Sequence, residues 1–370
     1  MKFVDLDTQF RSLESEIRQA IDDVLEHGQY IMGPEVYALE EELAEYCGAQ
    51  HVISTSSGTD ALLMALMSHG IGPGDAIIAP PFTFVATAEV VQLLGATTVF
   101  VDVDEKTYNI DIDQLEQTIK RVKKQGKLRL KGIIPVDLFG LPADYEAISK
   151  LAAEHDLFVL ADSAQSFGGA RGDKKVGTFG DIGATSFFPA KPLGCYGDGG
   201  AVFTNDDERA EIIRSIRFHG KGANQYDNVR TGITGRLDTI QAAILRCKLR
   251  VLEQEITARQ KVADRYTEGL AGVVRTPEIP GGCQTAWAQY TVRSAERDRI
   301  RKHLGELDIP TAVYYICPLH LQPAFRDADG AGVSMPVSEM LSAEVFSLPM
   351  HPYLNHQDQD QIIEAIKQAV

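Results

Sequence analysis

A single lysine, Lys191, lies in the mostly apolar stretch SFFPAKPLGCYGDGGAVF. It directly follows Phe188, Pro189 and Ala190 and precedes Pro192. Burial disfavours the ammonium form, so an amine in such a place becomes a neutral nucleophile near neutral pH. The residue therefore predicts Schiff-base chemistry. On its own, the pattern fits equally a lysine whose charged end reaches solvent from an apolar turn.

A second group of residues has the types that hold a phosphate. In STSSGTDALLMAL a strand-like run ends in Ser56 and Ser57, and a helix-like pattern starts at Gly58 and Thr59. The free N–H groups and the dipole of a helix N-terminus attract anions. Gly58 permits close backbone approach and Thr59 adds a hydroxyl. An ordinary Ser or Thr N-cap has the same appearance.

Two further groups could contact a planar ring. Phe82, Thr83 and Phe84 follow another strand-like run, and an aromatic side chain there could stack on a ring, although core packing is the commoner use of phenylalanine. Asp162 and Gln165 end the apolar run LFVLADSAQ. A carboxylate at that depth needs a positive partner. The partner is either an arginine or lysine, or a protonated pyridine nitrogen.

Taken together, these groups indicate one cofactor. A phosphate site, a stacking aromatic, a carboxylate for a ring nitrogen and an amine nucleophile are what pyridoxal 5'-phosphate requires. A nicotinamide site would need GxGxxG after the first strand, and a P-loop would need GxxxxGK; neither occurs at the required place. The sequence suggests no metal site.

The elements that would position these residues alternate between strand and helix. This order predicts an α/β fold with a mostly parallel sheet covered by helices on both faces. The two runs on either side of Lys191 are joined by a short loop, so we expect them to pair antiparallel. The expected strands span 51–57, 76–82, 97–103, 131–138, 157–164, 182–188 and 201–205, and the expected helices 59–70, 87–95, 112–124 and 144–155.

A long helical pattern over 237–270 is typical of a helix that bridges two domains. We expect a large cofactor-binding domain over 1–250 and a smaller C-terminal α+β domain over 251–370, with the Pro- and Gly-containing segment TPEIPGGCQ close to the boundary. In the smaller domain, 289–294 predicts a strand, and 296–308 and 359–370 predict helices.

Composition limits the class of protein. With 370 residues, of which 44% are hydrophobic, the chain can bury a large core and a smaller one. The net charge of -16 and the pI near 5.0 argue against a nucleic-acid partner. No run is apolar enough to predict a membrane span or a signal peptide, so we expect a cytoplasmic protein. Scattered cysteines predict neither disulfides nor zinc: Cys47, Cys195, Cys247, Cys283 and Cys317.

Over nearly its whole length the chain resembles the sugar aminotransferases of the DegT/DnrJ/EryC1/StrS family. The motifs that carry the resemblance are HGQYIMGPEV, SSGTDAL, FTFVATAE, DSAQSFGG, SFFPAKPLGCYGDGGA, GRLDTIQAAIL, PLHLQPAF and SLPMHPYL, in the family's order. The resemblance implies the aspartate-aminotransferase fold (fold type I) and pyridoxal phosphate as cofactor, with pyridoxamine phosphate formed during turnover.

The resemblance also implies roles for single residues. Lys191 would be the Schiff-base lysine and Asp162 the partner of the ring nitrogen, and Gln165 would donate to the ring's phenolic oxygen. Phe84 would stack on the ring. The phosphate would be held by Gly58, Thr59 and Ser186.

One segment departs from the family pattern. Family members usually carry Gly-x-Asn-x-Arg where this chain reads GITGR, and the asparagine reaches the cofactor phosphate of the neighbouring subunit. Thr234 replaces that asparagine here, and Arg236 remains. Thr234, Arg236 or the nearby Asn228 could make the contact. The family implies a homodimer with shared active sites.

The implied activity is transamination, because related dehydratases carry histidine where Lys191 stands. Glutamate would donate the amino group and leave as 2-oxoglutarate. A nucleotide-linked keto-sugar would accept the amino group. Three of the motifs look closest to enzymes that aminate UDP-linked 2-acetamido-2-deoxy-3-oxo-glucuronate for bacterial surface polysaccharides such as the lipopolysaccharide O-antigen. The alternatives are a TDP- or GDP-linked 3- or 4-keto-deoxysugar, or a non-catalytic cofactor-binding regulator. Candidate contacts for a uronate, each equally explained by surface charge or loop packing, are His219, Lys221, Arg230 and His320.

Overall fold

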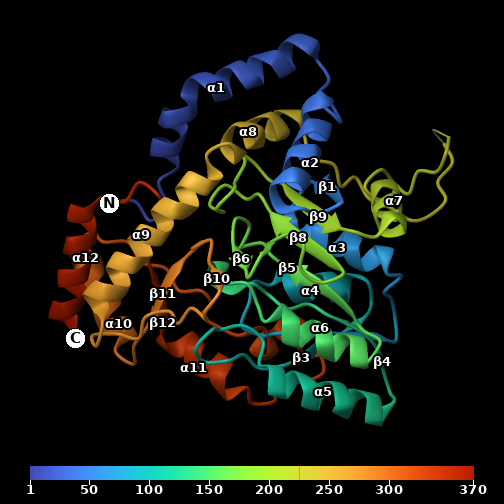
Figure 1. Cartoon of the computed structure of the whole chain (residues 1–370). Coiled ribbons are helices and arrows are strands. Elements are labelled where there is room, and N and C mark those ends of the chain that lie inside the picture. The colour runs from blue at the N-terminus through green and yellow to red at the C-terminus, as the bar shows by residue number, and fades with distance from the viewer. Residues whose placement is uncertain (225) are drawn as a thin grey trace.

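A mixed central sheet organises the chain in the computed structural model, which describes residues 1–224 and 226–370 (Figure 1). In this part of the chain the sheet has seven strands. The neighbours from β8 to β3 pair parallel, whereas β9 pairs antiparallel with both β1 and β8. The mostly parallel sheet predicted from the sequence is confirmed. Its order is β1 (His51–Thr55), β9 (Gly200–Thr204), β8 (Ile182–Ser186), β5 (Phe158–Asp162), β4 (Arg129–Ile133), β2 (Asp75–Ala79) and β3 (Thr97–Phe100).

Both faces of the sheet are apolar. Successive residues of a strand point to opposite sides, so a continuous apolar run supplies apolar side chains to each face. In β5, Leu160 belongs to one buried cluster, and Val159 and Ala161 belong to another. The Leu160 face is covered by α3 (Gly58–Ser68), α4 (Ala86–Leu93) and α7 (Asp207–Ile216). The opposite face is covered by α2 (Pro34–Cys47), α5 (Ile112–Gln125), α6 (Tyr145–Glu154) and α8 (Thr239–Leu249).

Local sequence sets the ends of these helices. The side chain of Asp111 accepts a hydrogen bond from the backbone N–H of Gln114 at the start of α5. Gly126, with a φ of +63°, ends the same helix in the left-handed conformation that glycine adopts without strain. Ser57 caps α3 in the same way, by accepting from the N–H of Asp60 at 3.0 Å. The capped start of α3 thus faces the end of the sheet.

The loop that carries Lys191 joins β8 to β9. Ser186 pairs with Gly200 in an antiparallel register, as the short connection predicted. The N–H of Phe187 donates to the carbonyl of Gly199 at 2.8 Å, so the loop closes directly above the last strand pair. Lys191 is therefore held at the edge where the parallel strands have their carboxyl ends.

The helical pattern over 237–270 forms two helices, so the prediction of one long helix is wrong. α8 ends at Leu249, and α9 spans Leu252–Leu270. Between them the N–H of Val251 bonds to the carbonyl of Lys248, three residues back, which tightens the turn and redirects the chain. Figure 1 shows α9 leading from the sheet toward the C-terminal elements.

The C-terminal elements have a core of their own. α9 packs there with α10 (Arg297–Glu306) and α12 (His356–Ala369), around the antiparallel pair β11 (Tyr290–Arg293) and β12 (Val345–Leu348). The strand and both helices expected there are present. The division of the chain at residue 250 stays a prediction. The remaining elements are α1 (Leu6–His27), α11 (Pro336–Glu344), the short strands β6 (Ala170–Arg171), β7 (Lys174–Lys175) and β10 (Cys283–Gln284), and the 3-10 turns Leu138–Gly140, Leu319–Leu321 and Pro323–Phe325.

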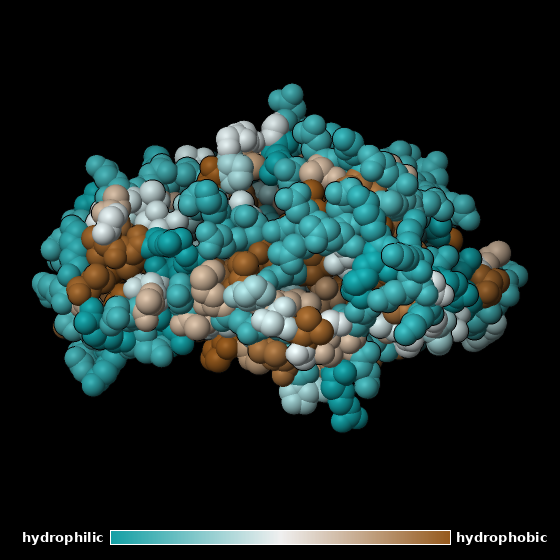
Figure 2. Space-filling view, turned by 90° about the horizontal axis from the view of Figure 1, so that it is seen from below, coloured by the Kyte–Doolittle hydropathy of each residue, from teal (hydrophilic) through white to brown (hydrophobic). Residues whose placement is uncertain are grey.

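The two termini lie on the same side of the molecule, beside α12 (Figure 1). The N–H of Met350 donates to the carbonyl of Phe3, which ties the N-terminus to the C-terminal elements. Among the described residues no helix is long and apolar enough to cross a membrane. The face shown in Figure 2 is mostly hydrophilic, with hydrophobic side chains in separate patches.

Candidate active site

The carboxyl ends of the strands surround a cavity of about 660 Å³. Ligands collect at this edge in open α/β sheets. Predicted site residues from four separate stretches of the sequence meet there. The residues that line it are Ser57, Gly58, Thr59, Leu62, Thr83, Phe84, Ala86, Val136, Asp162, Ala164, Gln165, Ala184, Ser186, Phe188, Ala190, Lys191, Asp198, Gln289, Tyr314 and Tyr315.

Lys191 lines the cavity, and its side chain is half-buried. Burial lowers the pKa of this amine to about 8, and the charge of nearby Asp162 opposes that effect. A substantial fraction of the amine is therefore neutral near physiological pH. This state is the nucleophile and proton acceptor that the sequence predicted.

Asp162 is buried at the end of β5, where Thr87 Oγ1 donates to its Oδ2 at 2.7 Å and the N–H of Ala164 donates to its Oδ1 at 3.3 Å. Burial raises the pKa of this carboxyl, and the two donors and Lys191 oppose the rise. Within residues 1–224 and 226–370 no arginine or lysine nitrogen lies within 4.0 Å of its carboxylate oxygens, although the charge of Lys191 is close enough to lower its pKa. Of the two partners left open by the sequence, the structure thus places a lysine nearby but forms no direct ion pair with it.

Gln165 is held in one orientation. The backbone N–H of Phe139 donates to its amide oxygen at 2.6 Å. Its amide nitrogen donates to the hydroxyl of Tyr315 at 3.1 Å, on the side of the cavity. Because the oxygen is occupied, the group that Gln165 offers to a ligand is a donor.

Gly58 and Ser186 bring the start of α3 against the end of β8. A Cβ added to Gly58 would lie 2.6 Å from the Cβ of Ser186, so only glycine fits here. The first N–H groups of α3 and the hydroxyl of Thr59 face the same cavity. This arrangement has the donors of a phosphate site.

The two phenylalanines of the FTF segment have different surroundings. Phe82 is fully buried and packs edge-on against Phe139 and Tyr108, as core packing predicts. Phe84 is 54% exposed and lines the cavity, with its ring centre 6.5 Å from that of Tyr315. Only Phe84 is placed to stack on a bound ring.

Another set of predicted residues lies on 218–224 and 226–236, which follow α7 in the chain (Figure 1). None of these residues lines the cavity. Thr234 Oγ1 lies 2.8 Å from the Nε2 of His219, and the side-chain amide of Asn228 donates to the carbonyl of His219. The guanidinium of Arg236 lies 4.5 Å from the ring centre of Phe218. Lys221 and Arg230 lie on the same segment.

His320 is not placed to contact a substrate, so the structure corrects that expectation. Its side chain is buried, and its Nε2 lies 3.4 Å from a carboxylate oxygen of Glu339. His320 follows Pro318 and Leu319 into a short 3-10 turn and does not line the cavity. The packing interpretation of this residue is the one that the structure supports.

Several residues of the site were not found from the sequence. Thr87 donates to Asp162 without lining the cavity and lies four residues after Thr83, so a search for polar residues at that spacing would have found it. Gln289, Tyr314 and Tyr315 come from the C-terminal part of the chain, and no local pattern marks them.

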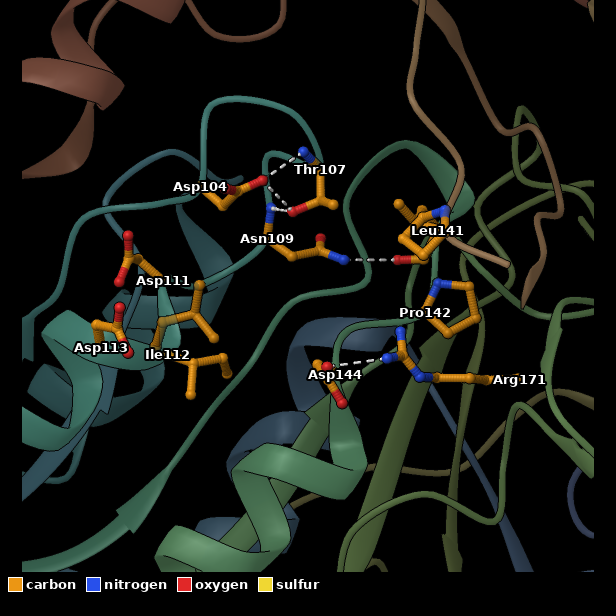
Figure 3. A pocket seen from close by; sticks show the side chains of 12 residues that line it. Asp104, Thr107, Asn109, Asp111, Ile112, Asp113, Leu141, Pro142, Asp144 and Arg171 are labelled. Carbon is orange, nitrogen blue, oxygen red and sulfur yellow. Dashed lines mark hydrogen bonds and ion pairs between the residues drawn. The ribbon is translucent and has the colours of Figure 1, made fainter. Parts of the chain in front are cut away.

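A second hollow, of about 360 Å³, lies near the start of α5 (Figure 3). Acidic side chains surround it, among them Asp104, Asp111 and Asp113, and Arg171 forms an ion pair of 2.9 Å with Asp144. None of the predicted site residues lines this hollow.

The residues of the main cavity fit pyridoxal phosphate. Asp162 is a buried carboxylate that forms no direct ion pair with the described residues, and Gln165 presents a donor. Gly58 leaves room where a Cβ would clash. Lys191 supplies an amine with a lowered pKa on the same cavity wall.

Comparison with known proteins agrees with this arrangement. The model of the DegT/DnrJ/EryC1/StrS aminotransferase family matches residues 11–367. A UDP-2-acetamido-2-deoxy-3-oxo-D-glucuronate aminotransferase of Pseudomonas aeruginosa is 47% identical over 356 residues, or 96% of each chain. A protein of Geobacillus stearothermophilus described as a pleiotropic regulatory protein is 41% identical, over 98% of this chain and 96% of its own.

Among solved structures, an aminotransferase of this family from Brucella abortus has a TM-score of 0.98 and 54% identity, and the match covers 100% of this chain and 99% of that one. The fold is therefore fold type I, as expected, and the cofactor is pyridoxal phosphate. The chain belongs to the DegT/DnrJ/EryC1/StrS family and is a pyridoxal-phosphate-dependent sugar aminotransferase.

Proposed function

We propose that this chain transfers an amino group from glutamate to UDP-linked 2-acetamido-2-deoxy-3-oxo-glucuronate. The observation that carries the proposal is the 47% identity to an enzyme of that name along 96% of both chains, together with a cavity in which Lys191 and Asp162 meet. The product would enter a bacterial surface polysaccharide such as the lipopolysaccharide O-antigen, and the reaction would take place in the cytoplasm.

Pyridoxal phosphate, when bound, supplies an aldehyde that condenses with amines and a ring that accepts electrons. Asp162 would hold a proton at the ring nitrogen, and the Gln165 amide would donate to the ring oxygen. Phe84 would cover one face of the ring. Gly58, Thr59 and Ser186 would bind the phosphate through the start of α3 and the end of β8.

Lys191 would carry the proton during the reaction. An amine with a pKa of about 8 can both accept and release a proton near neutral pH, which is the property that general acid–base catalysis needs. The apolar side chains of Phe188 and Ala190 line the cavity together with it. Lys191→Ala should remove both half reactions, and substantial remaining transamination would reject the assignment.

The residues 218–224 and 226–236 would complete the active site of a second subunit. In this chain they do not line the cavity, and within the described residues the Nε of Arg236 is buried without a hydrogen-bond partner. In a homodimer with shared sites, Arg236, Thr234 and Asn228 would reach the partner's phosphate site. His219, Lys221 and Arg230 would then lie near the sugar or its nucleotide.

Mixing two inactive variants tests the shared site. Lys191→Ala and Arg236→Ala should each be inactive, but a one-to-one mixture that exchanges subunits should recover about a quarter of the wild-type activity, because half of the dimers are mixed and each contains one intact site. If the mixture stays inactive although subunits exchange, each active site takes Lys191 and Arg236 from the same subunit, and the shared site is rejected.

A panel of keto-sugar nucleotides tests the substrate. The informative pair is the UDP-linked 3-keto sugar with a carboxylate at C6 and the same sugar with a hydroxymethyl group. Preference for the carboxylate is expected, and turnover of only a TDP- or GDP-linked substrate would reject the proposal.

A non-catalytic regulator is the second candidate, because one relative at 41% identity is described as a regulatory protein. A regulator needs neither the amine of Lys191 nor its lowered pKa. The loaded protein should absorb visible light and lose that absorbance when glutamate is added. Absorbance that no amino donor changes would favour the regulator.

A further inference from the structure

A second buried carboxylate, Asp137, lies behind the cavity wall. It is fully buried and accepts four hydrogen bonds: from the N–H of Ala143 at 2.9 Å, Tyr145 Oη at 2.7 Å, Ser163 Oγ at 2.9 Å and Ser166 Oγ at 2.7 Å. It does not line the cavity, so it has no direct contact with a ligand there.

The partners of Asp137 come from two segments that the sequence separates. Ala143 and Tyr145 belong to the turn that starts α6. Ser163 and Ser166 belong to the loop after β5. Ser163 directly follows Asp162, and Ser166 directly follows Gln165. The carboxylate therefore ties the α6 turn to the loop that carries both residues aimed at the cofactor ring.

Backbone contacts extend the same connection. The N–H of Asp137 donates to the carbonyl of Asp162 at 3.0 Å. Two residues later, the N–H of Phe139 donates to the amide oxygen of Gln165. A shift of the 137–139 segment would thus move Asp162 and Gln165 together.

The charge of Asp137 decides how its partners point. Burial raises the pKa of this carboxyl to about 6, and its four donors oppose the rise, so the group is ionised at neutral pH. An ionised carboxylate only accepts hydrogen bonds, so both serine hydroxyls must act as donors toward it. An amide at this position would present one acceptor and one donor. With the amide nitrogen in the place of Oδ2, both serine hydroxyls would have to turn; in the place of Oδ1, it would oppose the N–H of Ala143 and the hydroxyl of Tyr145.

We propose that Asp137 is a positioning residue that sets where Asp162 and Gln165 meet the cofactor ring. The inference rests on the proposed roles of those two residues. Replacing Asp137 should therefore weaken cofactor binding by more than the accompanying loss of folding stability explains, because the loop that Asp137 holds contributes two contacts to the ring.

The test compares Asp137→Asn with Asp102→Asn. Asp102 is the matched control because it is also buried and accepts from the N–H groups of Val337 and Ser338 and from the Ser338 hydroxyl, at a place away from the cavity. Cofactor-free protein is titrated with pyridoxal phosphate, and its denaturant unfolding is followed separately.

Asp137→Asn should weaken cofactor binding about 10-fold to 100-fold, the range seen when groups that orient ligating residues are removed. It should also shift the pH at which the bound cofactor changes its absorbance, since Asp162 controls the ring proton. Asp102→Asn should lower stability and leave both readouts unchanged. Equal cofactor affinity in the two variants would overturn the inference.

A milder change keeps the test decisive if Asp137→Asn does not fold. Ser166→Ala removes one of the four donors and should weaken cofactor binding about threefold, or about 0.7 kcal/mol. Unchanged affinity in a folded Ser166→Ala protein would also reject the role. A wild-type protein that binds no cofactor would instead refute the proposed function itself.

Discussion

The amide oxygen of Gln165 accepts a hydrogen bond of 2.6 Å from the backbone N–H of Phe139. This contact leaves the amide nitrogen as the group that reaches Tyr315 and the cavity. The orientation of a glutamine, which has both donor and acceptor, is thus decided by a residue 26 positions earlier in the chain. It predicts what a substitution by glutamate would do.

Gln165→Glu should bind pyridoxal phosphate about tenfold more weakly. A carboxylate can still accept from Phe139, but it no longer donates to the ring oxygen, and one lost hydrogen bond corresponds to about 1–2 kcal/mol. Titration of cofactor-free protein measures the effect. Gln359→Glu is the control, because Gln359 in α12 is also buried and its side-chain amide donates to the carbonyl of Val262 in α9. Equal affinity for both variants would contradict the assigned role.

Thr87→Val should move the acid limb of the pH–rate profile to higher pH. Burial raises the pKa of Asp162, and the hydrogen bond from Thr87 opposes that rise, so removing the hydroxyl raises the pKa further. Asp162 must be ionised to hold the ring proton and would then ionise only at higher pH. Thr98→Val, which removes another buried threonine hydroxyl, should leave the profile in place. A limb that moves to lower pH would contradict the prediction.

Lys191→Met should stabilise the cofactor-free protein at pH 7 by about 1–3 kcal/mol. The folded pKa of Lys191 is about 8, below its ordinary 10.5, so the unfolded chain binds the extra proton between these values. Stability therefore rises with pH across that window, and the advantage of the variant should disappear above it. Denaturant unfolding at neutral pH and above pH 10.5 checks the sign.

Lys248 provides the matched comparison. Burial also lowers its pKa to about 8, but its amine donates to the carbonyl of Gly194 at 2.6 Å and lies 4.2 Å from the ring centre of Tyr196. Lys248→Met removes these contacts and should not stabilise the protein. If both substitutions changed the free energy of unfolding by the same amount, the destabilisation by the Lys191 amine would be that of any buried lysine and would not indicate a functional role.

Gly58→Ala should weaken binding of the cofactor and of inorganic phosphate. The new Cβ would lie 2.6 Å from the Cβ of Ser186, so α3 and β8 would have to separate at the phosphate site. Gly305→Ala is the control, since its Cβ would meet open space and a helical alanine is favoured by about 1 kcal/mol over glycine. Phosphate affinity equal to that of the wild type would argue against this site.

Local patterns made the fold and most of the cavity predictable. The alternation of strands and helices predicted the parallel sheet. The residues at or just after the ends of its strands include the predicted site residues Gly58, Phe84, Asp162 and Lys191. A parallel sheet brings the carboxyl ends of its strands to one edge, so residues placed there by the sequence must meet. The chemistry of each side chain follows from its type and from the apolar residues around it.

Contacts between distant segments were not predictable in this way. The helical period continues through Arg250 and Val251, so it did not show that the chain turns between α8 and α9. His320 has the residue type of a substrate contact, but packing against Glu339 buries it. Tyr315 and Gln289 reach the cavity only because the C-terminal elements fold back on the sheet edge.

The sequence by itself determined the class of fold, the cofactor and the amine that reacts, because these depend on residue types and on spacing within single strand–loop–helix units. The tertiary structure alone decided which donor Gln165 offers, that Asp162 forms no direct ion pair in the described chain, and that Asp137 lies behind both. Hydrogen bonding and burial join segments far apart in the sequence, and no local periodicity records them.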